Sequence, residues 1–145
     1  MNDSVQGHNR RTICALIVEN SPAMCLAWEA RLSRMKGIGF VASVSSGMKA
    51  LMHFDHVQPD LVLANFDLPG MNGLQLAQAL ALRSPETKVI ITFYDWHEVG
   101  PGKPLNDPAF ISNSQLYKTL PRQVMKLLAD SHNAAAPPSR LWHPD

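Results

Sequence analysis

Residues 59–73 constrain the fold of this chain more than any other stretch. They contain a short, wholly apolar run at positions 61–64, which polar residues bound on both sides. Such a run is typical of a central strand in a parallel sheet that is covered on both faces. A turn rich in Pro, Gly and Asn follows at positions 68–73, so a helix is predicted to begin near Leu74. Open α/β sheets keep their functional sites at this edge, where the strands end.

The rest of the chain alternates between strand and helix patterns. Apolar runs predict strands at residues 13–18, 40–43, 61–64, 89–92 and 109–112. Helical spacing predicts a first helix that Ser21 caps and that Lys36 and Gly37 end, two helices over residues 48–54 and 74–82, and a last helix that Ser114 caps. The short connections favour parallel neighbours, and hence a doubly wound α/β sheet.

The two outer helices should pack on the sheet through apolar residues at helical spacing, which are Met24, Trp28, Leu32 and Met35 in the first and Leu116, Leu120, Val124 and Leu127 in the last. Pro121 interrupts the last helix. Either that helix kinks there, or a tight first turn gives way to a helix that restarts at Pro121. Residues 95–108 carry three prolines and two glycines, so we expect a loop in place of the fourth helix.

Composition indicates one folded domain over residues 12–130, with a disordered leader at 1–11 and a flexible tail at 131–145. The formal net charge of +1 gives no electrostatic case for nucleic acid or an anionic membrane. No apolar run is long enough to span a bilayer. Cys14 and Cys25 are interpreted as reduced thiols of a cytoplasmic protein.

The stretch 59–73 closely resembles the active strand and loop of response-regulator receiver domains. That pattern is Pro-Asp, four apolar residues, a phospho-accepting Asp and a turn like Met-Pro-Gly-Met-Asp-Gly. All positions but one fit in kind, and the exception is Asn65, at the position of the phospho-accepting Asp. The resemblance covers residues 12–128 and weakens at 95–108. It implies the flavodoxin-like (CheY-like) fold, a five-stranded parallel sheet with strand order 2-1-3-4-5.

The resemblance also implies a site whose acids are largely missing. An amide has no anionic oxygen to attack phosphorus, so Asn65 should not form an acylphosphate. Glu19 and Asn20 align with the family's two metal-binding acids, which leaves one carboxylate. We therefore expect weak or absent Mg²⁺ binding, with Glu19 as a weak candidate ligand, and no other cofactor. Asp67 is the remaining acid of the loop, and its side chain is expected to point to solvent.

Two further positions of the family's site are altered. The Thr or Ser that binds a phosphoryl oxygen aligns with Phe93, while Thr92 lies one residue earlier, and a small shift in register would return Thr92 to the site. The Lys that neutralises the phosphoryl group aligns with Asn113. The combined losses predict that phosphorylation is no longer the input.

Aromatic residues near the end of the sheet are candidates for partner binding. Tyr94 and Trp96 adjoin or lie in the Pro-rich segment, Phe110 aligns with the family's switch aromatic, and Tyr117 lies on the last helix. Trp96 could instead fold back to fill space that the missing helix leaves.

We therefore predict a stand-alone receiver-like domain of two-component (phosphorelay) signalling, acting as a phosphorylation-independent protein-interaction module and not as an enzyme. Expected partners are a histidine kinase, another response regulator or an output protein, with a homodimer possible. Direct nucleic-acid binding is not expected, since too few residues follow Leu128 for a DNA-binding output domain. The alternatives are a phosphoacceptor regulator with a rearranged site and, with less support, a flavodoxin-like cofactor-binding protein, although no Gly-rich phosphate loop follows the first strand.

Overall fold

The computed structural model describes residues 12–94 and 110–133. Our predictions for the leader 1–11, the loop 95–108 and residues 134–145 of the tail lie outside this part of the chain, whereas residues 131–133, which we had assigned to the tail, belong to the last helix. Strands and helices alternate within it, and their bounds are β1 Ile13–Val18, α2 Pro22–Ser33, β2 Ile38–Val44, α3 Gly47–Val57, β3 Leu61–Asn65, α4 Gly73–Arg83, β4 Lys88–Phe93, β5 Phe110–Ser112 and α6 Asn113–Asn133. None of these helices is both long and apolar enough to cross a membrane.

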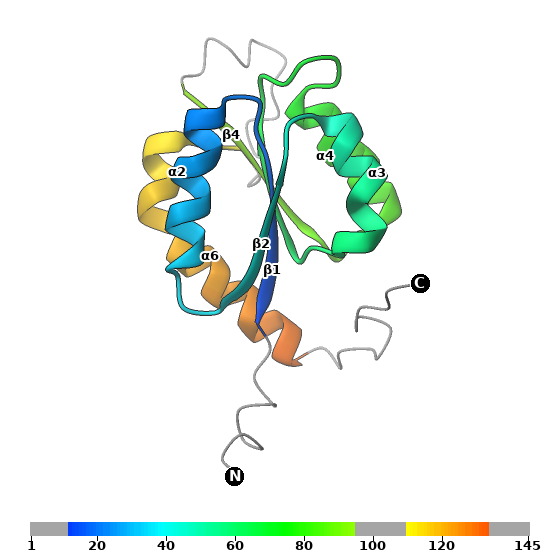
Figure 1. Cartoon of the computed structure of the whole chain (residues 1–145). Coiled ribbons are helices and arrows are strands. Elements are labelled where there is room, and N and C mark those ends of the chain that lie inside the picture. The colour runs from blue at the N-terminus through cyan, green and yellow to red at the C-terminus, as the bar shows by residue number, and fades with distance from the viewer. Residues whose placement is uncertain (1–11, 95–109, 134–145) are drawn as a thin grey trace.

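The strands form one parallel sheet in the order β2-β1-β3-β4-β5, which confirms the predicted topology. Helices α2 and α6 cover one face of the sheet, and α3 and α4 cover the other (Figure 1). All strands end at the same edge of the sheet. The strand order reverses between β1 and β3, so the ends of these two strands form the switch point where sheets of this kind carry their sites.

Each face of the sheet has its own apolar core. The α2–α6 core contains the predicted inward-facing residues, all buried or partly buried, namely Met24, Trp28, Leu32, Met35, Leu116, Leu120, Val124 and Leu127. The α3–α4 core is built around Leu16, Ala50, Phe54, Val62, Leu76 and Leu80. The central strands β1 and β3 are covered on both sides, which explains why they read as continuous apolar runs.

Side-chain caps decide where the helices begin. Ser21 caps α2 as predicted, because its Oγ accepts a hydrogen bond from the Met24 N–H at 3.3 Å. α4 begins with a reciprocal pair in which Asn72 Oδ1 accepts from the Gln75 N–H at 2.8 Å and Gln75 Oε1 accepts from the Asn72 N–H at 2.9 Å. Such a pair satisfies two backbone donors at once, so it ties the turn after β3 firmly to α4.

The end of α2 differs from the prediction. The helix ends at Ser33 and not at Lys36. The Met35 N–H donates at 3.0 Å to the carbonyl of Leu32, three residues earlier, so the chain makes a tighter turn here than an α-helix does. Gly37 then redirects the chain with a φ of 96°. The prediction was wrong because it placed the end of the helix directly before the turn at Gly37, whereas the helix ends at Ser33.

The start of α6 also differs from the prediction. The helix begins at Asn113, and Ser112, not Ser114, lies at the capping position. There the Gln115 N–H donates to Ser112 Oγ at 3.4 Å. Two serines two residues apart offer the same cap chemistry, so sequence alone could not choose between them.

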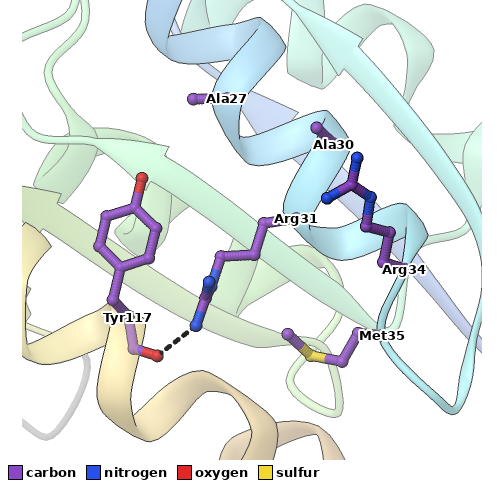
Figure 2. A pocket seen from close by; sticks show the side chains of 6 residues that line it. All are labelled: Ala27, Ala30, Arg31, Arg34, Met35 and Tyr117. Carbon is purple, nitrogen blue, oxygen red and sulfur yellow. Dashed lines mark hydrogen bonds between the residues drawn. The ribbon is translucent and has the colours of Figure 1, made fainter.

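Helix α6 runs unbroken through Pro121, so a helix restarting at this residue was wrong. Pro has no N–H, and the Tyr117 carbonyl, four residues earlier, therefore lacks its helical donor. Arg31 of α2 supplies one, because its Nη2 donates to this carbonyl at 2.7 Å (Figure 2). The Arg31 guanidinium also lies 4.6 Å from the centroid of the Tyr117 ring, which stacks on Trp28 with centroids 4.8 Å apart. Helix α2 thus compensates for the proline in α6.

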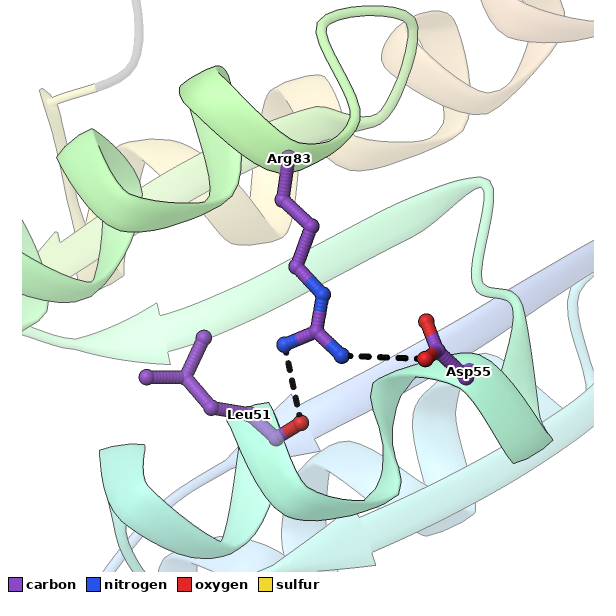
Figure 3. A network of polar contacts seen from close by, with 3 residues as sticks. All are labelled: Leu51, Asp55 and Arg83. Atoms are coloured by element: carbon purple, nitrogen blue, oxygen red, sulfur yellow. Dashed lines mark hydrogen bonds and ion pairs between the residues drawn. The ribbon is translucent and has the colours of Figure 1, made fainter.

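Arg83 makes the corresponding link between α3 and α4. Its Nη1 donates to the Leu51 carbonyl at 3.0 Å, and its Nη2 lies 3.1 Å from Asp55 Oδ2 (Figure 3). The guanidinium is also 5.5 Å from the centroid of the Phe54 ring. Asp55 is largely exposed, so water weakens the ion pair, and the bond to the carbonyl gives this link most of its geometric specificity.

Cys25 of α2 lies beside an acidic side chain. Its Sγ is 3.7 Å from Glu29 Oε2, which also accepts a hydrogen bond from Ser43 Oγ at 2.6 Å. Burial raises the pKa of the Cys25 thiol, and the charge of Glu29 acts in the same direction. Little thiolate should therefore be present at pH 8. We expect iodoacetamide to label Cys25 several-fold more slowly in the native protein than in urea, as followed by peptide mass spectrometry. Equal rates would contradict this account.

Candidate functional site

The ends of β1, β3 and β4 bring three polar side chains to one edge of the sheet. Glu19 directly follows β1, Asn65 is the last residue of β3, and Thr92 pairs with Asn65 in the register of β3 and β4. The residues two places earlier in these strands all belong to the α2–α6 core, namely Ile17, Leu63 and Ile90. Because side chains alternate along a strand, the three polar residues project on the same side of the sheet.

Glu19 is buried, with 5% of its surface exposed, and hydrogen bonds satisfy its carboxylate. Asn65 Nδ2 lies 3.1 Å from both Oε1 and Oε2 of Glu19 and donates to the carboxylate. The backbone N–H of Ser21 donates to Oε2 at 3.0 Å. Ser21 is the N-cap of α2, so the carboxylate also lies at the positive end of that helix. The negative charge of Glu19 is therefore stabilised by N–H groups of the chain itself.

The orientation of the Asn65 amide follows from its two neighbours. Its Nδ2 faces the Glu19 carboxylate, which in its charged form only accepts, and its Oδ1 accepts from the Asp67 N–H at 3.0 Å, which only donates. Exchanging oxygen and nitrogen would break both contacts. The amide thus joins the end of β1 to the loop after β3, and it presents nitrogen, not oxygen, to the acid.

The turn after β3 lies close against Asn65. The Gly73 N–H donates to the Phe66 carbonyl at 2.9 Å, and a Cβ added at Gly73 would lie 2.6 Å from the Asn65 carbonyl oxygen. Gly70 has a φ of 78°, in the region that favours glycine. The Pro-Gly-Met-Asn-Gly turn therefore keeps the close packing that a functional loop at this edge requires, although the residue it encloses is neutral.

Thr92, not Phe93, occupies the site. Thr92 is 2% exposed and lies beside Asn65, whereas Phe93 is fully buried on the opposite face of the sheet. The Phe93 ring packs against Phe110 with centroids 6.4 Å apart, and Phe110 lies 6.2 Å from Phe66. The structure therefore favours the shifted register that we considered, and it returns a hydroxyl residue to the position that we had aligned with Phe93.

Three other predicted site residues do not join this cluster. Asn20 and Asp67 are exposed, and Asp67 contributes only its backbone N–H. Asn113 begins α6 with its Oδ1 buried, and in the described residues this oxygen has no hydrogen-bond partner. The described part of the chain shows no hydrogen bond from Asn113 to Glu19 or Asn65.

The candidate partner-binding aromatics differ in exposure. Tyr94 is 60% exposed, Phe110 only 8%, and Trp96 lies outside the described residues. Phe110 therefore belongs to the core in this structure and offers little surface to a partner. Tyr117 is 38% exposed and lines a shallow pocket between α2 and α6 (Figure 2), together with Ala27, Ala30, Arg31, Arg34 and Met35.

The donor set does not fit Mg²⁺. The ion prefers several oxygen ligands in octahedral geometry, of which one or two are carboxylates. The cluster of Glu19, Asn65 and Thr92 offers a single carboxylate, and the group that faces it is an N–H donor, which repels a cation. Among residues 12–94 and 110–133, no three His, Cys, Asp or Glu side chains gather closely enough to hold a metal ion.

Sequence reasoning missed two groups that shape these surfaces. The Ser21 N–H contacts Glu19 through a local turn that the Glu-Asn-Ser-Pro order permits but does not require. The Arg31 contact to α6 had a signal, since Pro121 leaves the Tyr117 carbonyl in need of a donor. No pattern in the sequence names the residue that supplies it.

The chain forms a doubly wound sheet with a polar cluster where β1 and β3 end. It also has a close Pro-Gly turn after β3 and a Thr at the end of β4. Together these features define a receiver-type α/β protein. Comparison with known families agrees, because the model of the response regulator receiver domain matches residues 15–95. The chain belongs to this family.

Curated relatives agree with this membership. An uncharacterized response regulatory protein of Yersinia pestis is 30% identical over 108 residues, which is 70% of this chain and 44% of that protein. The DNA-binding transcriptional activator EvgA of Escherichia coli K12 is 29% identical over 77 residues, 53% of this chain and 37% of its own length. This chain thus spans less than half of these curated relatives.

The response regulator domain of Thermotoga maritima CheB shares the fold, with a TM-score of 0.62 at 18% identity over 86% of this chain and 98% of that domain.

Proposed function

We propose that this chain is a receiver domain of two-component signalling that acts as a protein-interaction module without being phosphorylated. One observation carries the proposal. At the position of the phospho-accepting Asp stands an amide whose nitrogen donates to Glu19 and whose oxygen accepts from the Asp67 N–H. A phosphoryl acceptor needs an anionic oxygen that is free to attack, and this side chain has none.

The surroundings of Asn65 support the same proposal. In a working site two or three carboxylates repel one another until a divalent cation binds them. Here an amide stands in place of one carboxylate and donates a hydrogen bond to Glu19, so this repulsion is absent. The pocket therefore needs no cation to be stable. The buried Phe93–Phe110 contact adds apolar packing between the last residue of β4 and the first residue of β5, which opposes rearrangement of Phe110. The pocket is thereby held in one state.

A partner protein would bind this single conformation through the helices and loops around the sheet. Candidate partners are a histidine kinase, another response regulator or an output protein, and Tyr117 with its cationic neighbours in the α2–α6 pocket is a candidate contact region. The comparisons do not support our expectation that the protein avoids nucleic acid, because the relative EvgA is named as DNA-binding.

A phosphoacceptor with a rearranged site is the alternative, and the presence of Thr92 beside Asn65 favours it in part. The deciding experiment is incubation with acetyl phosphate and Mg²⁺, followed by intact-mass measurement. We expect no phosphoryl adduct, while a receiver domain that retains the Asp, treated in parallel, should gain one. A hydroxylamine-sensitive adduct on this chain, at Asp67 for example, would overturn the proposal.

A further inference from the structure

Strand β2 forms a long edge of the described sheet. It spans seven residues, whereas β5 at the other edge has three described residues. Edge strands present unpaired backbone groups that can bind a further strand, and short strands limit this exposure. In the described residues, β2 therefore exposes a longer row of unpaired backbone groups than β5 does.

The backbone groups of β2 divide between the two sides of the strand. The Val44 carbonyl accepts from the Glu19 N–H at 3.1 Å, so the backbone groups of Val44 and, by alternation, Ala42 face β1. The N–H and C=O groups of Val41 and Ser43 therefore point away from the sheet. Within the described residues these outward backbone groups make no hydrogen bond.

Two of the usual protections of an edge strand are missing from β2, while the register irregularity at Gly39 lies before the segment 40–44. Natural edges carry charged side chains or proline, which discourage pairing with another chain. Residues 38–46 contain neither. Phe40 is 57% exposed although it lies in the strand, and it is the largest apolar group on this edge. The segment between Gly37 and Gly47 thus combines outward backbone groups with the exposed Phe40 ring and with side chains that carry no charge of their own.

We propose that β2 pairs with β2 of a second copy of this chain, in antiparallel orientation about a two-fold axis midway between the two Ala42 residues. Val41 of each copy then lies opposite Ser43 of the other. Each such pair exchanges two hydrogen bonds, so every outward group of Val41 and Ser43 acquires a partner. In the same register Phe40 lies opposite Val44 of the other copy, and both side chains are on the α3 side of the sheet.

A second copy fits this edge better than an unrelated strand for two reasons. The side chains of β2 itself carry no charge, and the Glu29 carboxylate of α2 that lies beside Ser43 is hydrogen-bonded to its Oγ, so like-charge repulsion between two identical edges is limited. The two-fold arrangement also matches donors to acceptors by symmetry, as closed dimers do. Four hydrogen bonds and two apolar contacts make a small interface, so the dimer should be weak and concentration-dependent. The inference does not depend on the state of the Glu19–Asn65 pair, nor on the proposed function.

Sedimentation velocity over a concentration series tests the proposal, with Phe40→Lys as the main variant. The wild-type protein should dimerise with a dissociation constant below about 1 mM. Phe40→Lys places a charge of one sign on each edge and should raise this constant about tenfold or more. Leu82→Lys is the matched control, since Leu82 of α4 is a 91% exposed apolar residue away from β2, and it should leave the constant unchanged. Circular dichroism and the Tm verify that both variants fold.

Hydrogen exchange identifies the edge directly. The amides of Val41 and Ser43 should exchange fast in dilute protein and become protected as the concentration rises, while the amide of exposed Leu82 serves only as a reference. A protein that stays monomeric up to about 1 mM would overturn the proposal. So would a dimer that Leu82→Lys disrupts as strongly as Phe40→Lys, or a dimer in which Val41 and Ser43 stay unprotected, which would indicate another interface or another partner.

Discussion

Asn65→Asp is expected to destabilise the protein by about 3 kcal/mol at pH 7 without divalent cations. The change replaces an N–H donor with a carboxylate oxygen at the two 3.1 Å contacts to Glu19. The lost hydrogen bonds to a charged group contribute about 1.5–3 kcal/mol, and a second negative charge beside a buried one adds repulsion. Urea unfolding of the two proteins measures the difference.

The pH dependence of this loss has a definite sign. In the variant the two carboxyl groups repel each other, so the folded state holds a proton to a higher pH than the unfolded chain does. A group whose folded-state pKa is raised contributes stability at low pH that is lost as the pH rises. The stability difference between Asn65→Asp and wild type should thus be smallest near pH 4 and grow between about pH 4 and pH 7. A constant difference across this window would contradict the repulsion argument.

A divalent cation should reverse part of the loss in the variant only. If the two carboxylates hold Mg²⁺ with a dissociation constant of about 1 mM, then about 10 mM Mg²⁺ restores about 1.4 kcal/mol. The double variant Glu19→Gln, Asn65→Asp is the sharpest control, because it exchanges the acid and the amide and keeps one of each. It should recover most of the wild-type stability and show no response to Mg²⁺. Asn20→Asp, which adds a charge at an exposed position, should cost less than about 0.5 kcal/mol.

Sequence patterns predicted the fold more completely than they predicted the contacts within the site. Continuous apolar runs predicted every strand of the described sheet, because β1 and β3 are buried on both faces and have no polar alternation to obscure them. The cap at Ser21 was predictable because one hydroxyl stands before one proline. The ends of the helices were harder to predict, since α3 ends at Val57 and its C-cap is Gln58 at a φ of 49°, a conformation for which glycine is the expected residue.

At the site, sequence identified the residues but not their contacts. The resemblance to receiver domains placed Glu19 and Asn65 in one site where the strands end, and in the structure they lie in direct contact. The assignment of Phe93 depended on an alignment without gaps, and one residue of shift exchanges the two faces of a strand, so Thr92 takes that place. The direction of the Asn65 amide depends on the Asp67 N–H, which only the folded loop supplies.

Arg31→Met is expected to cost about 1–2 kcal/mol, because it removes the donor to the Tyr117 carbonyl while keeping an aliphatic side chain of similar length. Loss of the cation–π contact to the Tyr117 ring contributes about 0.5 kcal/mol of this. Urea unfolding again gives the measurement. Arg34→Ala is the matched control from the same pocket, since Arg34 is exposed, and it should change the stability by less than about 0.5 kcal/mol.

The role of Pro121 in this effect can be isolated by a double-mutant cycle. Pro121→Ala restores a backbone N–H four residues after Tyr117, so the carbonyl regains its helical donor and no longer needs Arg31. Arg31→Met should then cost about 1 kcal/mol less in the Pro121→Ala background than in the wild type, and the effect of Pro121→Ala itself cancels in the cycle. An unchanged cost would mean that Arg31 stabilises the protein by packing against α6 alone. A positive coupling would make α2 the source of the hydrogen bond that Pro121 removes from α6, which explains how this helix tolerates a proline in its interior.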